Sequence, residues 1–545
     1  MTALMESHCI PFLEIPGTTK LFADYLYNPS RLRPLYSFNP FDTDSFHRAA
    51  EIIPRDNTLR ACVAEVLHEQ NHVYGGGHAT EEQIARLRHG GAVAVVTGQQ
   101  VGLFSGPAYS IYKALTTIRL AQELSEAGLP AVPVFWLACE DHDLAEVNHC
   151  FILNRQHRLV RIQHPDTPAA KMRVGEILLG ENVTRLRDEL SQLWAASPDS
   201  EALNALVAAY QPQFTYAEAF AQLLHKLFPG AGVVVLNPLD ARLSCLAANL
   251  FRRALEESEV LQERLRTRQR ELEHAGYHAQ VRLHENSTLL FLNIGPERQP
   301  VRRRGEAFFV PGRGTLSKEE LLQELDAHPE NFTPNVLLRP LMQDMLLPTV
   351  AYVAGPAEVA YFAQASTLYK VLLGRMPVIV PRASVTLVAR KLQRLLAKYQ
   401  LDLCAVFQAA NDLFNRMAYQ RLPRRLQSRL EQTEKRLEKM LAGSATALNA
   451  LDPTLAGAVE TSQRKMLYQF HKIRTKAARA YAQRSELLAR HLAMLSDSLY
   501  PRRALQERTV NFFSFLVGYG VDLVSRLAEH IIFPRREHQV LFLDR

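Results

Sequence analysis

Residues 92–149 read AVAVVTGQQVGLFSGPAYSIYKALTTIRLAQELSEAGLPAVPVFWLACEDHDLAEVNH. The stretch opens with an apolar run rich in β-branched residues at 92–97, which predicts a strand. A turn with three glycines follows, and a helical pattern then begins at Pro107 and ends at Gly128. A second apolar run occupies 132–138. The order of strand, glycine turn, helix and strand predicts a parallel βαβ unit.

Three more short apolar runs of this kind occur later, at 232–236, 349–353 and 377–380. Short strands that alternate with helical segments predict an α/β fold with a Rossmann-like, doubly wound parallel sheet. The long gaps between these strands must contain insertions. We place the insertions at about 150–215 and 265–345.

Residues 388–500 contain few glycines and carry an apolar residue at every seventh position, which predicts long helices that pair as a coiled coil. Asp452 and Pro453 form a favourable helix cap and first turn, so we expect two antiparallel helices that reverse near 451–453. The seven-residue step includes Leu430, Leu437, Leu451, Val459, Met466, Ile473, Ala480, Leu487 and Met494.

The neighbouring seam of the same helices is more polar and contains Gln463 and His491. This pattern fits a partner helix from another subunit, and it also fits a solvated helix face. We favour the first alternative, a homodimer formed through the coiled coil.

With 545 residues, the chain is too long for one small core. We expect a Rossmann-like core with insertions at 1–387, an α-helical coiled-coil domain at 388–500, and a C-terminal segment at 501–545 that returns to the core.

The composition is that of a globular protein, with 47% hydrophobic and 22% charged residues. A net charge of +7 is modest and dispersed, so no nucleic-acid partner is expected, whereas anionic small substrates fit. No signal peptide or membrane span is indicated, and the six cysteines are scattered without a zinc-type spacing. These features predict a cytoplasmic protein with reduced thiols.

The glycine turn follows the first strand, at the edge where open α/β sheets bind ligands. Its backbone N–H groups could approach a phosphate or carboxylate at the positive end of the next helix, or the glycines could only form a tight turn. The candidate anion-binding residues are Gly98, Gln99, Gln100, Gly102, Ser105, Gly106, Tyr109 and Lys113.

An acidic cluster follows the second strand and therefore belongs to the same edge of the sheet. Glu140, Asp141 and His142 could deprotonate an amine, orient an ammonium group or hold a metal ion. Alternatively, they form an acidic first turn that only stabilises a helix. We favour a functional role, with Asp141 and His142 foremost, and we assign no metal ligands. The neighbouring Cys139 has no recognisable base partner, so a catalytic thiol is not expected.

Two later loops add candidates. Arg382 and Ser384 follow the last core strand, where an arginine could bind an anion in a bidentate manner. Gln506, Glu507 and Arg508 lie where the helices should rejoin the core. They could contact a nucleotide or simply satisfy one another's hydrogen bonds.

Several long strings resemble the BshC family, the cysteine-adding enzymes of bacillithiol biosynthesis. The resemblance covers nearly the whole chain, in order, and is carried by TGQQVGLFSGPAYSIYKALTTIRLAQEL (97–124), VPVFWLACEDHDLAEVNH (132–149), NFTPNVLLRPLMQDMLLPTVAYVAGPAEVAYFAQ (331–364), MPVIVPRASVTL (376–387), LQERTVNFFSFLVGYG (505–520) and HQVLFL (538–543).

The resemblance implies a ligase that joins L-cysteine to the free amine of glucosaminyl-malate through an amide bond. Such a bond requires activation of the carboxylate, for which ATP or another nucleotide is the ordinary source; a requirement for a divalent metal stays open. We expect the glycine turn and Arg382 to bind anions, and Asp141 and His142 to act on the amine.

Two other functions fit the residues. One is a nucleotidylyl transferase-like ligase for another amino acid, although the HxGH and KMSKS motifs of those enzymes are absent. The other is a non-catalytic coiled-coil protein that senses a metabolite or assembles partners.

Overall fold

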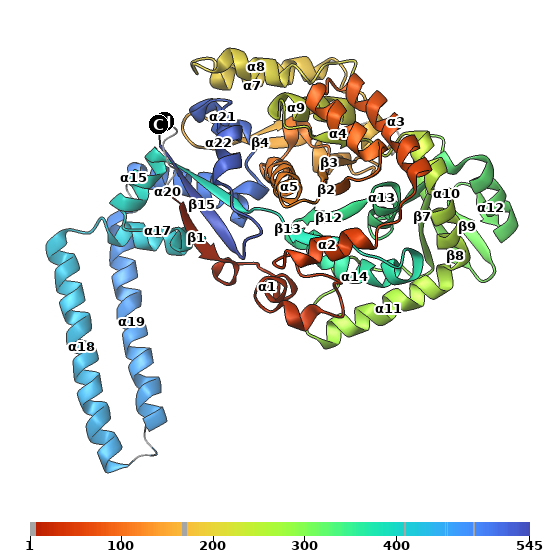
Figure 1. Ribbon diagram of the computed structural model, residues 1–545. Helices are drawn as coiled ribbons and strands as arrows, with labels where there is room; N and C mark the ends of the chain where they lie inside the picture. Colours follow the sequence, from red (N-terminus) through yellow and green to blue (C-terminus); the bar gives the residue numbers. More distant parts are fainter. Residues whose placement is uncertain are drawn as a thin grey trace.

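A parallel sheet forms the centre of the computed structural model, which describes residues 7–165, 172–407, 410–452, 454, 456–482 and 485–544 (Figure 1). Its five strands lie in the order β13-β12-β2-β3-β6, and every neighbouring pair is parallel. Their bounds are Val93–Gln100 for β2, Ala131–Ala138 for β3, Val234–Leu236 for β6, Thr349–Ala354 for β12 and Val378–Pro381 for β13.

Of these five strands, β2 comes first along the chain and lies in the middle of the sheet, with β3 and β6 on one side and β12 and β13 on the other. The order reverses between β2 and β12, which makes this the topological switch point. The predicted Rossmann-like sheet is confirmed, and each of its five predicted strands is present.

The strands are apolar along their whole length because both faces of the sheet are covered. Val95 packs into one hydrophobic core and Val96 into the other, as alternating side chains of a strand must. Helices α5 (Tyr109–Glu126) and α9 (Tyr216–Leu227) contribute to the core of Val95. The opposite core contains side chains of α3 (Asn57–Val73), α4 (His78–Arg88), α10 (Ala241–Glu256), α13 (Arg339–Leu346) and α14 (Pro356–Leu372).

Two boundaries differ from the prediction. Strand β2 extends through Gln100, because residues 98–100 continue to pair with β3. Helix α5 begins at Tyr109, two residues after Pro107, because Pro107 forms a β-bridge with Asn511. The helix ends as predicted, since Gly128 adopts a φ of +87° just after it.

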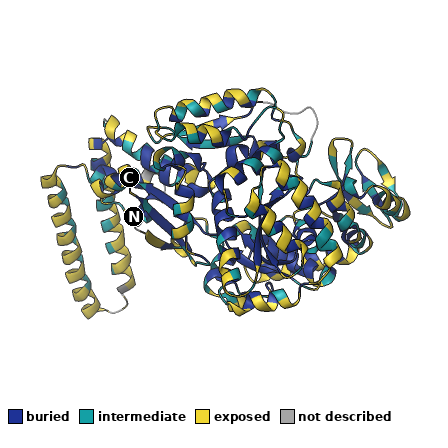
Figure 2. Ribbon diagram, turned by 45° about the horizontal axis from the view of Figure 1, so that its top comes forward, coloured by how far each residue is buried: buried dark blue, intermediate teal, exposed yellow. Residues whose placement is uncertain are grey.

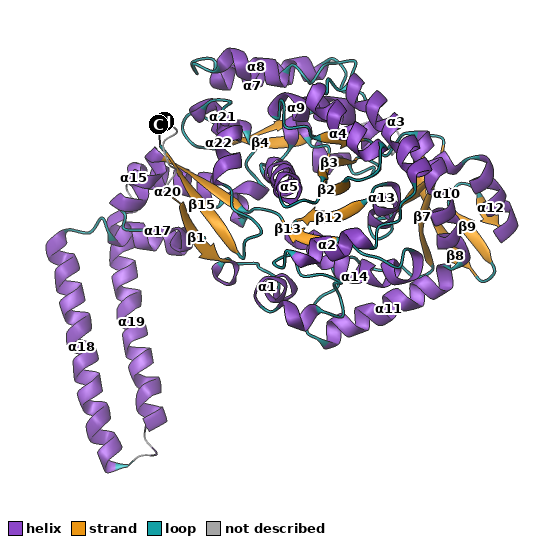
Figure 3. Cartoon of the chain, in the orientation of Figure 1, coloured by secondary structure: helices purple, strands orange, loops and turns teal. Residues whose placement is uncertain are grey.

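Between β3 and α9 the chain forms a hairpin and helices outside the main sheet (Figure 3). These elements are α6 (Leu144–Val147), the β4–β5 hairpin (His149–Leu153 and Leu159–Gln163), α7 (Asn182–Trp194) and α8 (Ser200–Val207).

A second group of elements, between β6 and β12, contains a five-stranded antiparallel sheet. Its strands are β7 (Ser287–Ile294), β8 (Glu297–Arg304), β9 (Ala307–Val310), β10 (Gly314–Leu316) and β11 (Phe332–Pro334); helices α11 (Ser258–His274) and α12 (Lys318–Ala327) accompany them.

A third sheet joins the two ends of the chain. Strand β15 (Glu537–Leu543) pairs with β1 (Ser7–Pro11) on one side and with β14 (Val385–Ala389) on the other. The remaining short helices of the two ends are α1 (Lys20–Tyr27), α2 (Asp44–Glu51), α21 (Phe513–Tyr519) and α22 (Leu523–His530).

His538 of β15 is fully buried, with Nδ1 2.8 Å from Ser384 Oγ and Nε2 2.8 Å from Thr386 Oγ1. Burial lowers the pKa of His538 to about 4. An unfolded histidine is protonated near pH 6.5, so the unfolded state binds this proton at a higher pH than the folded state does. The contribution of neutral His538 to stability is therefore fully present above pH 6.5 and is lost as the pH falls toward 4.

We expect His538 alone to lower the free energy of unfolding by about 2 kcal/mol between pH 6.5 and pH 5. Urea titrations at several pH values across this range give the slope of the free energy of unfolding against pH. In His538→Gln this slope should decrease by the amount that corresponds to one bound proton. A residual slope remains, because burial also lowers the pKa of His225 to about 4. An unchanged slope in His538→Gln would contradict the prediction.

The helical part projects from the body as a long hairpin of α18 (Arg424–Leu451) and α19 (Ala456–Ala482) (Figure 1). The two helices reverse after Leu451, and Asp452 Oδ1 accepts hydrogen bonds from Thr454 N and Oγ1; Pro453 lies outside the described residues. At its base lie α15 (Arg390–Lys398), α16 (Leu403–Val406), α17 (Ala410–Tyr419) and α20 (Glu486–Leu499).

The predicted seams of this hairpin face different ways. Leu430 and Leu437 are half-buried, whereas Met466 and Ile473 are exposed. Most of the hairpin is exposed along its length (Figure 2). Gln463, from the polar seam, donates to Leu441 O of α18 at 2.7 Å. The apolar row of α19 thus lies outside the contact between the two helices.

None of the helices in the described ranges has the length and hydropathy needed to cross a bilayer.

Candidate functional site

A cavity of about 720 Å³ opens at the switch point of the parallel sheet. Its walls include the carboxyl ends of β2, β3 and β12 and the residue that follows β13. Side chains of the antiparallel sheet, among them Phe291, Arg298 and Arg302, form another wall. This is the position at which α/β sheets bind their ligands.

Most of the candidates from the sequence line this cavity. They are Gly98, Gln99, Gln100, Tyr109, Lys113, Glu140, Asp141, His142, Arg382 and Arg508. The two predicted loops therefore converge on one site.

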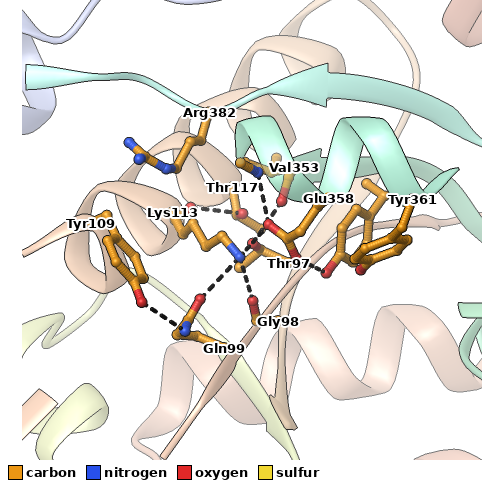
Figure 4. A network of polar contacts seen from close by, with 12 residues as sticks. Thr97, Gly98, Gln99, Tyr109, Lys113, Thr117, Val353, Glu358, Tyr361 and Arg382 are labelled. Atoms are coloured by element: carbon orange, nitrogen blue, oxygen red, sulfur yellow. Dashed lines mark hydrogen bonds and ion pairs between the residues drawn. The ribbon is translucent and has the colours of Figure 1, made fainter. Parts of the chain in front are cut away.

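Lys113 is fixed at the end of β2 by several partners (Figure 4). Its ammonium donates to Gly98 O at 2.7 Å and to Gln99 Oε1 at 3.1 Å, and it forms an ion pair with Glu358. Glu358 also accepts from Tyr352 OH at 2.7 Å and from Gly355 N at 2.7 Å. The Lys113 charge is thus already balanced by a carboxylate of the chain.

The second half of the glycine turn, with Gly102, Ser105 and Gly106, is internal and does not line the cavity. Gly102 N and Gly106 N donate within the turn, and Ser105 N donates to Tyr210 OH. Asn511 Nδ2 donates to Phe104 O at 2.6 Å and to Gly106 O at 2.7 Å. A Cβ on Gly102 would lie 2.9 Å from Gly106 Cα, so glycine is required here for close packing.

Glu140 is the buried carboxylate of the cavity, with only 6% of its surface exposed. Burial raises its pKa, although the charges of Arg298, Arg339 and Arg173 oppose that shift. Among the described residues, none donates a hydrogen bond to its carboxylate. A carboxylate with free acceptor positions inside a cavity can receive a proton or bind an ammonium group.

Asp141 and His142 are more accessible and lie next to Glu140. Asp141 Oδ1 is 3.3 Å from His142 Nδ1 and 3.7 Å from Arg298 Nη1, and it accepts from His142 N at 2.7 Å. With 52% of its side chain exposed, Asp141 can still reach a ligand at the cavity mouth.

Arg382 lines the cavity, but Ser384, Gln506 and Glu507 do not. These three side chains are buried and hydrogen-bonded to the protein, Glu507 to Arg382 at 2.7 Å and Gln506 to the backbone of Leu387. The structure therefore does not bring these three side chains to the cavity with the other candidates. Of the C-terminal candidates, Arg508 alone reaches the cavity.

Three important residues were missed by the sequence analysis: Arg298, Arg339 and Glu358. Arg298 lies 3.8 Å above the Phe291 ring and donates to Thr333 Oγ1 at 2.9 Å. Arg339 lines the cavity, and its guanidinium carbon lies 5.8 Å from the centre of the Trp136 ring. The motif Gly355-Pro356 at the end of β12 could have pointed to Glu358, because it occupies the same edge as the two predicted loops.

Cys139 stands beside the acidic cluster without taking part in it. Its thiol is buried, 3.3 Å from Asn237 Oδ1, and burial raises its pKa well above the ordinary value. The thiol is therefore protonated at neutral pH and a poor nucleophile.

The cavity carries seven lysine and arginine side chains against four aspartates and glutamates. Such a lining attracts an anionic ligand, while Glu140 and Asp141 offer acceptors for an amine. Within the described ranges, we find no group of three His, Cys, Asp or Glu side chains that could hold a metal ion.

Comparison with protein families gives two matches that together span the chain. The family model "Bacillithiol biosynthesis BshC, N-terminal Rossmann-like domain" matches residues 5–383. The model "Bacillithiol biosynthesis BshC, C-terminal coiled-coil domain" matches residues 385–543.

Curated relatives carry the name "Putative cysteine ligase BshC". The chain is 40% identical over 525 residues to the protein of Koribacter versatilis strain Ellin345, which covers 96% of this chain and 98% of the relative. It is 37% identical over 539 residues to that of Solibacter usitatus strain Ellin6076, covering 98% and 100% of the two chains. The Salinibacter ruber relative is 34% identical over 542 residues, or 98% of each chain.

Proposed function

The chain belongs to the BshC family of bacillithiol biosynthesis and is a ligase, and from this we propose that it joins L-cysteine to the free amine of glucosaminyl-malate. The observation that carries the proposal is the combination, in one cavity, of a basic lining with a buried carboxylate, Glu140, that accepts no hydrogen bond from the described residues. The substrate has the matching groups, namely the two carboxylates of malate and an amine.

In this proposal the arginines bind the anionic groups. Arg298 and Arg302, from the antiparallel sheet, line the wall that is suited to the malate carboxylates. Glu140 accepts the proton that the amine loses when it attacks the cysteine carboxyl carbon. Asp141 and His142, which are more exposed, orient the amine at the mouth.

The cysteine carboxylate needs activation before it can form an amide. A nucleotide such as ATP would supply a better leaving group than the carboxylate oxygen. Arg382 and Arg508 are the pocket residues whose charge fits its phosphates. Gln506 and Glu507 do not fit such a ligand, because their polar atoms are engaged inside the protein.

Bimane-labelled thiols measured by mass spectrometry in cells lacking this protein test the proposal. We expect loss of bacillithiol and accumulation of glucosaminyl-malate, both restored by the intact gene. Asp141→Ala or His142→Ala should lower product formation by about tenfold or more. Asp143→Ala is the matched control, because Asp143 is exposed and does not line the cavity. Normal bacillithiol without the protein would contradict the proposed activity.

We also propose that two chains form a homodimer through the helical hairpin. The outward row of α19 exposes Met466 and Ile473, the latter with 61% of its surface accessible. A second copy would cover this row in the manner of a coiled coil.

Ile473→Lys is expected to convert the dimer to monomers, because a charged side chain would be buried in the contact. Sedimentation velocity measures the change. Thr461→Lys adds the same charge on another face of α19 and should leave the dimer intact. A dimer that survives Ile473→Lys would place the contact elsewhere.

A further inference from the structure

The turn formed by residues 506–508 connects the end of the helical domain to the cavity. Gln506 fixes the turn to β14, donating to Leu387 O at 2.9 Å and accepting from Leu387 N at 2.8 Å. It also donates to Ser498 O, at the end of α20, at 2.7 Å. The next two side chains are connected to the site in different ways. Arg508 lines the cavity directly, whereas Glu507 contacts the cavity residue Arg382.

Glu507 is 1% exposed and uses both of its carboxylate oxygens. Oε1 accepts from Arg382 Nη2 at 2.7 Å and from Ser384 Oγ at 2.8 Å. Oε2 accepts from Val385 N at 2.7 Å. Burial would raise the pKa of Glu507, but the Arg382 charge and these hydrogen bonds lower it, so the group is a carboxylate at neutral pH.

Arg382 has one side engaged with the protein and another available to a ligand. Besides the bond to Glu507, it donates from Nη1 to Ala383 O at 2.8 Å. The guanidinium carbon is 5.5 Å from the centre of the Tyr109 ring. A guanidinium has five N–H donors, and its other three have no partner among the described residues. Since Arg382 is a cavity residue with 4% of its side chain exposed, a ligand anion can reach these donors.

A carboxylate is required at position 507, because a neutral side chain cannot satisfy all three donors. Glutamine has the same shape but only one acceptor oxygen. If that oxygen faces Val385 N–H, the amide NH₂ faces the Arg382 guanidinium and repels it. Arg382 would then turn toward Glu358, another cavity carboxylate whose charge acts on it, and this position is less suitable for binding a ligand anion.

We propose that Glu507 is a positioning residue, which acts through Arg382 to fix the anion-binding edge of the cavity. The inference rests on the proposed function in one respect, the binding of an anionic group by Arg382. It assigns a role at the site to the segment that follows the helical hairpin.

A double-mutant cycle on the binding of inorganic pyrophosphate, measured by titration calorimetry with the full-length protein, tests this inference. Pyrophosphate serves as the probe because Arg382 is proposed to bind the phosphates of a nucleotide, and pyrophosphate supplies phosphate groups without requiring catalysis. Glu507→Gln should weaken pyrophosphate binding by about tenfold. In an Arg382→Gln background the same change should alter binding by less than about twofold, because a residue that acts through another has no effect once that partner is gone.

Asp344→Asn is the matched control for burying an amide in place of a carboxylate. Asp344 is fully buried and accepts from Gln343 Nε2 at 2.9 Å, but it does not line the cavity. It should lower the thermal midpoint, as Glu507→Gln does, and leave pyrophosphate binding unchanged. Loss of stability alone would therefore not reproduce the result.

Several outcomes would overturn the inference: no pyrophosphate binding by the wild-type chain, unchanged binding in Glu507→Gln, or an equal effect of Glu507→Gln with and without Arg382. The proposed function is judged separately, by formation of the cysteine amide. Pyrophosphate binding with the expected cycle but no ligation would reject that function and keep the role of Glu507. Ligation together with an equal effect of Glu507→Gln in the presence and absence of Arg382 would support the proposed function and reject the role of Glu507.

Discussion

Glu140→Gln is expected to lower kcat by about a hundredfold or more, since removal of a general base typically costs this much. Glu140 is the buried carboxylate of the cavity that has no donor among the described residues. The amide keeps the shape of the side chain but cannot accept the proton that the substrate amine releases. Binding of the substrates should change less than turnover, so the effect belongs in kcat rather than in KM.

The pH dependence of turnover provides a second test of Glu140. The active form is the carboxylate, so activity is lost as the pH falls through its pKa. Because burial raises that pKa, the loss should occur at a higher pH than for an ordinary glutamate. Glu140→Gln should have residual activity without this acidic limb.

The control for Glu140→Gln is again Asp344→Asn, a buried carboxylate outside the cavity. Asp344→Asn should retain the wild-type kcat and the same loss of turnover at low pH, even if its thermal midpoint falls. Wild-type turnover by Glu140→Gln would exclude Glu140 as the base and leave Asp141 and His142 as the candidates.

The parallel sheet was predictable because its strands are apolar on both faces. Neighbours such as Val95 and Val96 pack into separate cores, so no polar residue interrupts the run. The strand end was less predictable, since Gly98 resembles a turn residue but continues the pairing with Trp136. Whether Gly98 begins a turn or continues the strand depends on its pairing with the neighbouring strand β3.

Half of the site could be predicted from one topological rule. The carboxyl ends of parallel strands share an edge, which correctly brings residues 98–100 to Glu140 and Asp141. The same rule does not reach Arg298, which lies on an antiparallel strand far along the chain and is positioned by the Phe291 ring and Thr333. Tertiary contacts of this kind leave no local pattern in the sequence.

The C-terminal turn is a place where the sequence leaves two alternatives open. Its polar residues could contact a nucleotide or satisfy one another's hydrogen bonds, and in the structure Gln506 and Glu507 have buried backbone and side-chain partners. Sequence alone cannot distinguish these alternatives, because both need polar side chains next to one another. Burial decides between them, and burial is set by how the helical domain returns to β14.

The second large effect is expected for the buried ion pair between Lys113 and Glu358. Glu358→Gln should lower the free energy of unfolding by about 3–5 kcal/mol, the usual cost of leaving one partner of a buried pair uncompensated. Only 3% of the Lys113 side chain is exposed, so water cannot replace the lost carboxylate. Urea titration followed by tryptophan fluorescence is a suitable measurement, because Trp136 lies in the same sheet.

Lys113→Met combined with Glu358→Gln should recover most of that loss, because the double variant buries no unpaired charge. Arg242→Gln is the surface comparison: Arg242 lies 2.8 Å from Asp240 but is 46% exposed, and such pairs contribute less than about 1 kcal/mol. Similar losses of unfolding free energy in Glu358→Gln and Arg242→Gln would show that the buried ion pair stabilises the fold no more than the surface pair does.

The pH dependence of the Glu358→Gln variant separates charge from packing. Burial already lowers the pKa of Lys113, and loss of Glu358 removes the charge that opposes this shift. The unfolded chain then binds the proton at a higher pH than the folded chain, so stability should rise with pH toward the ordinary lysine pKa. A loss of packing alone would be the same at every pH. A loss that shrinks as the solution becomes alkaline would therefore identify an unpaired Lys113 ammonium as its cause.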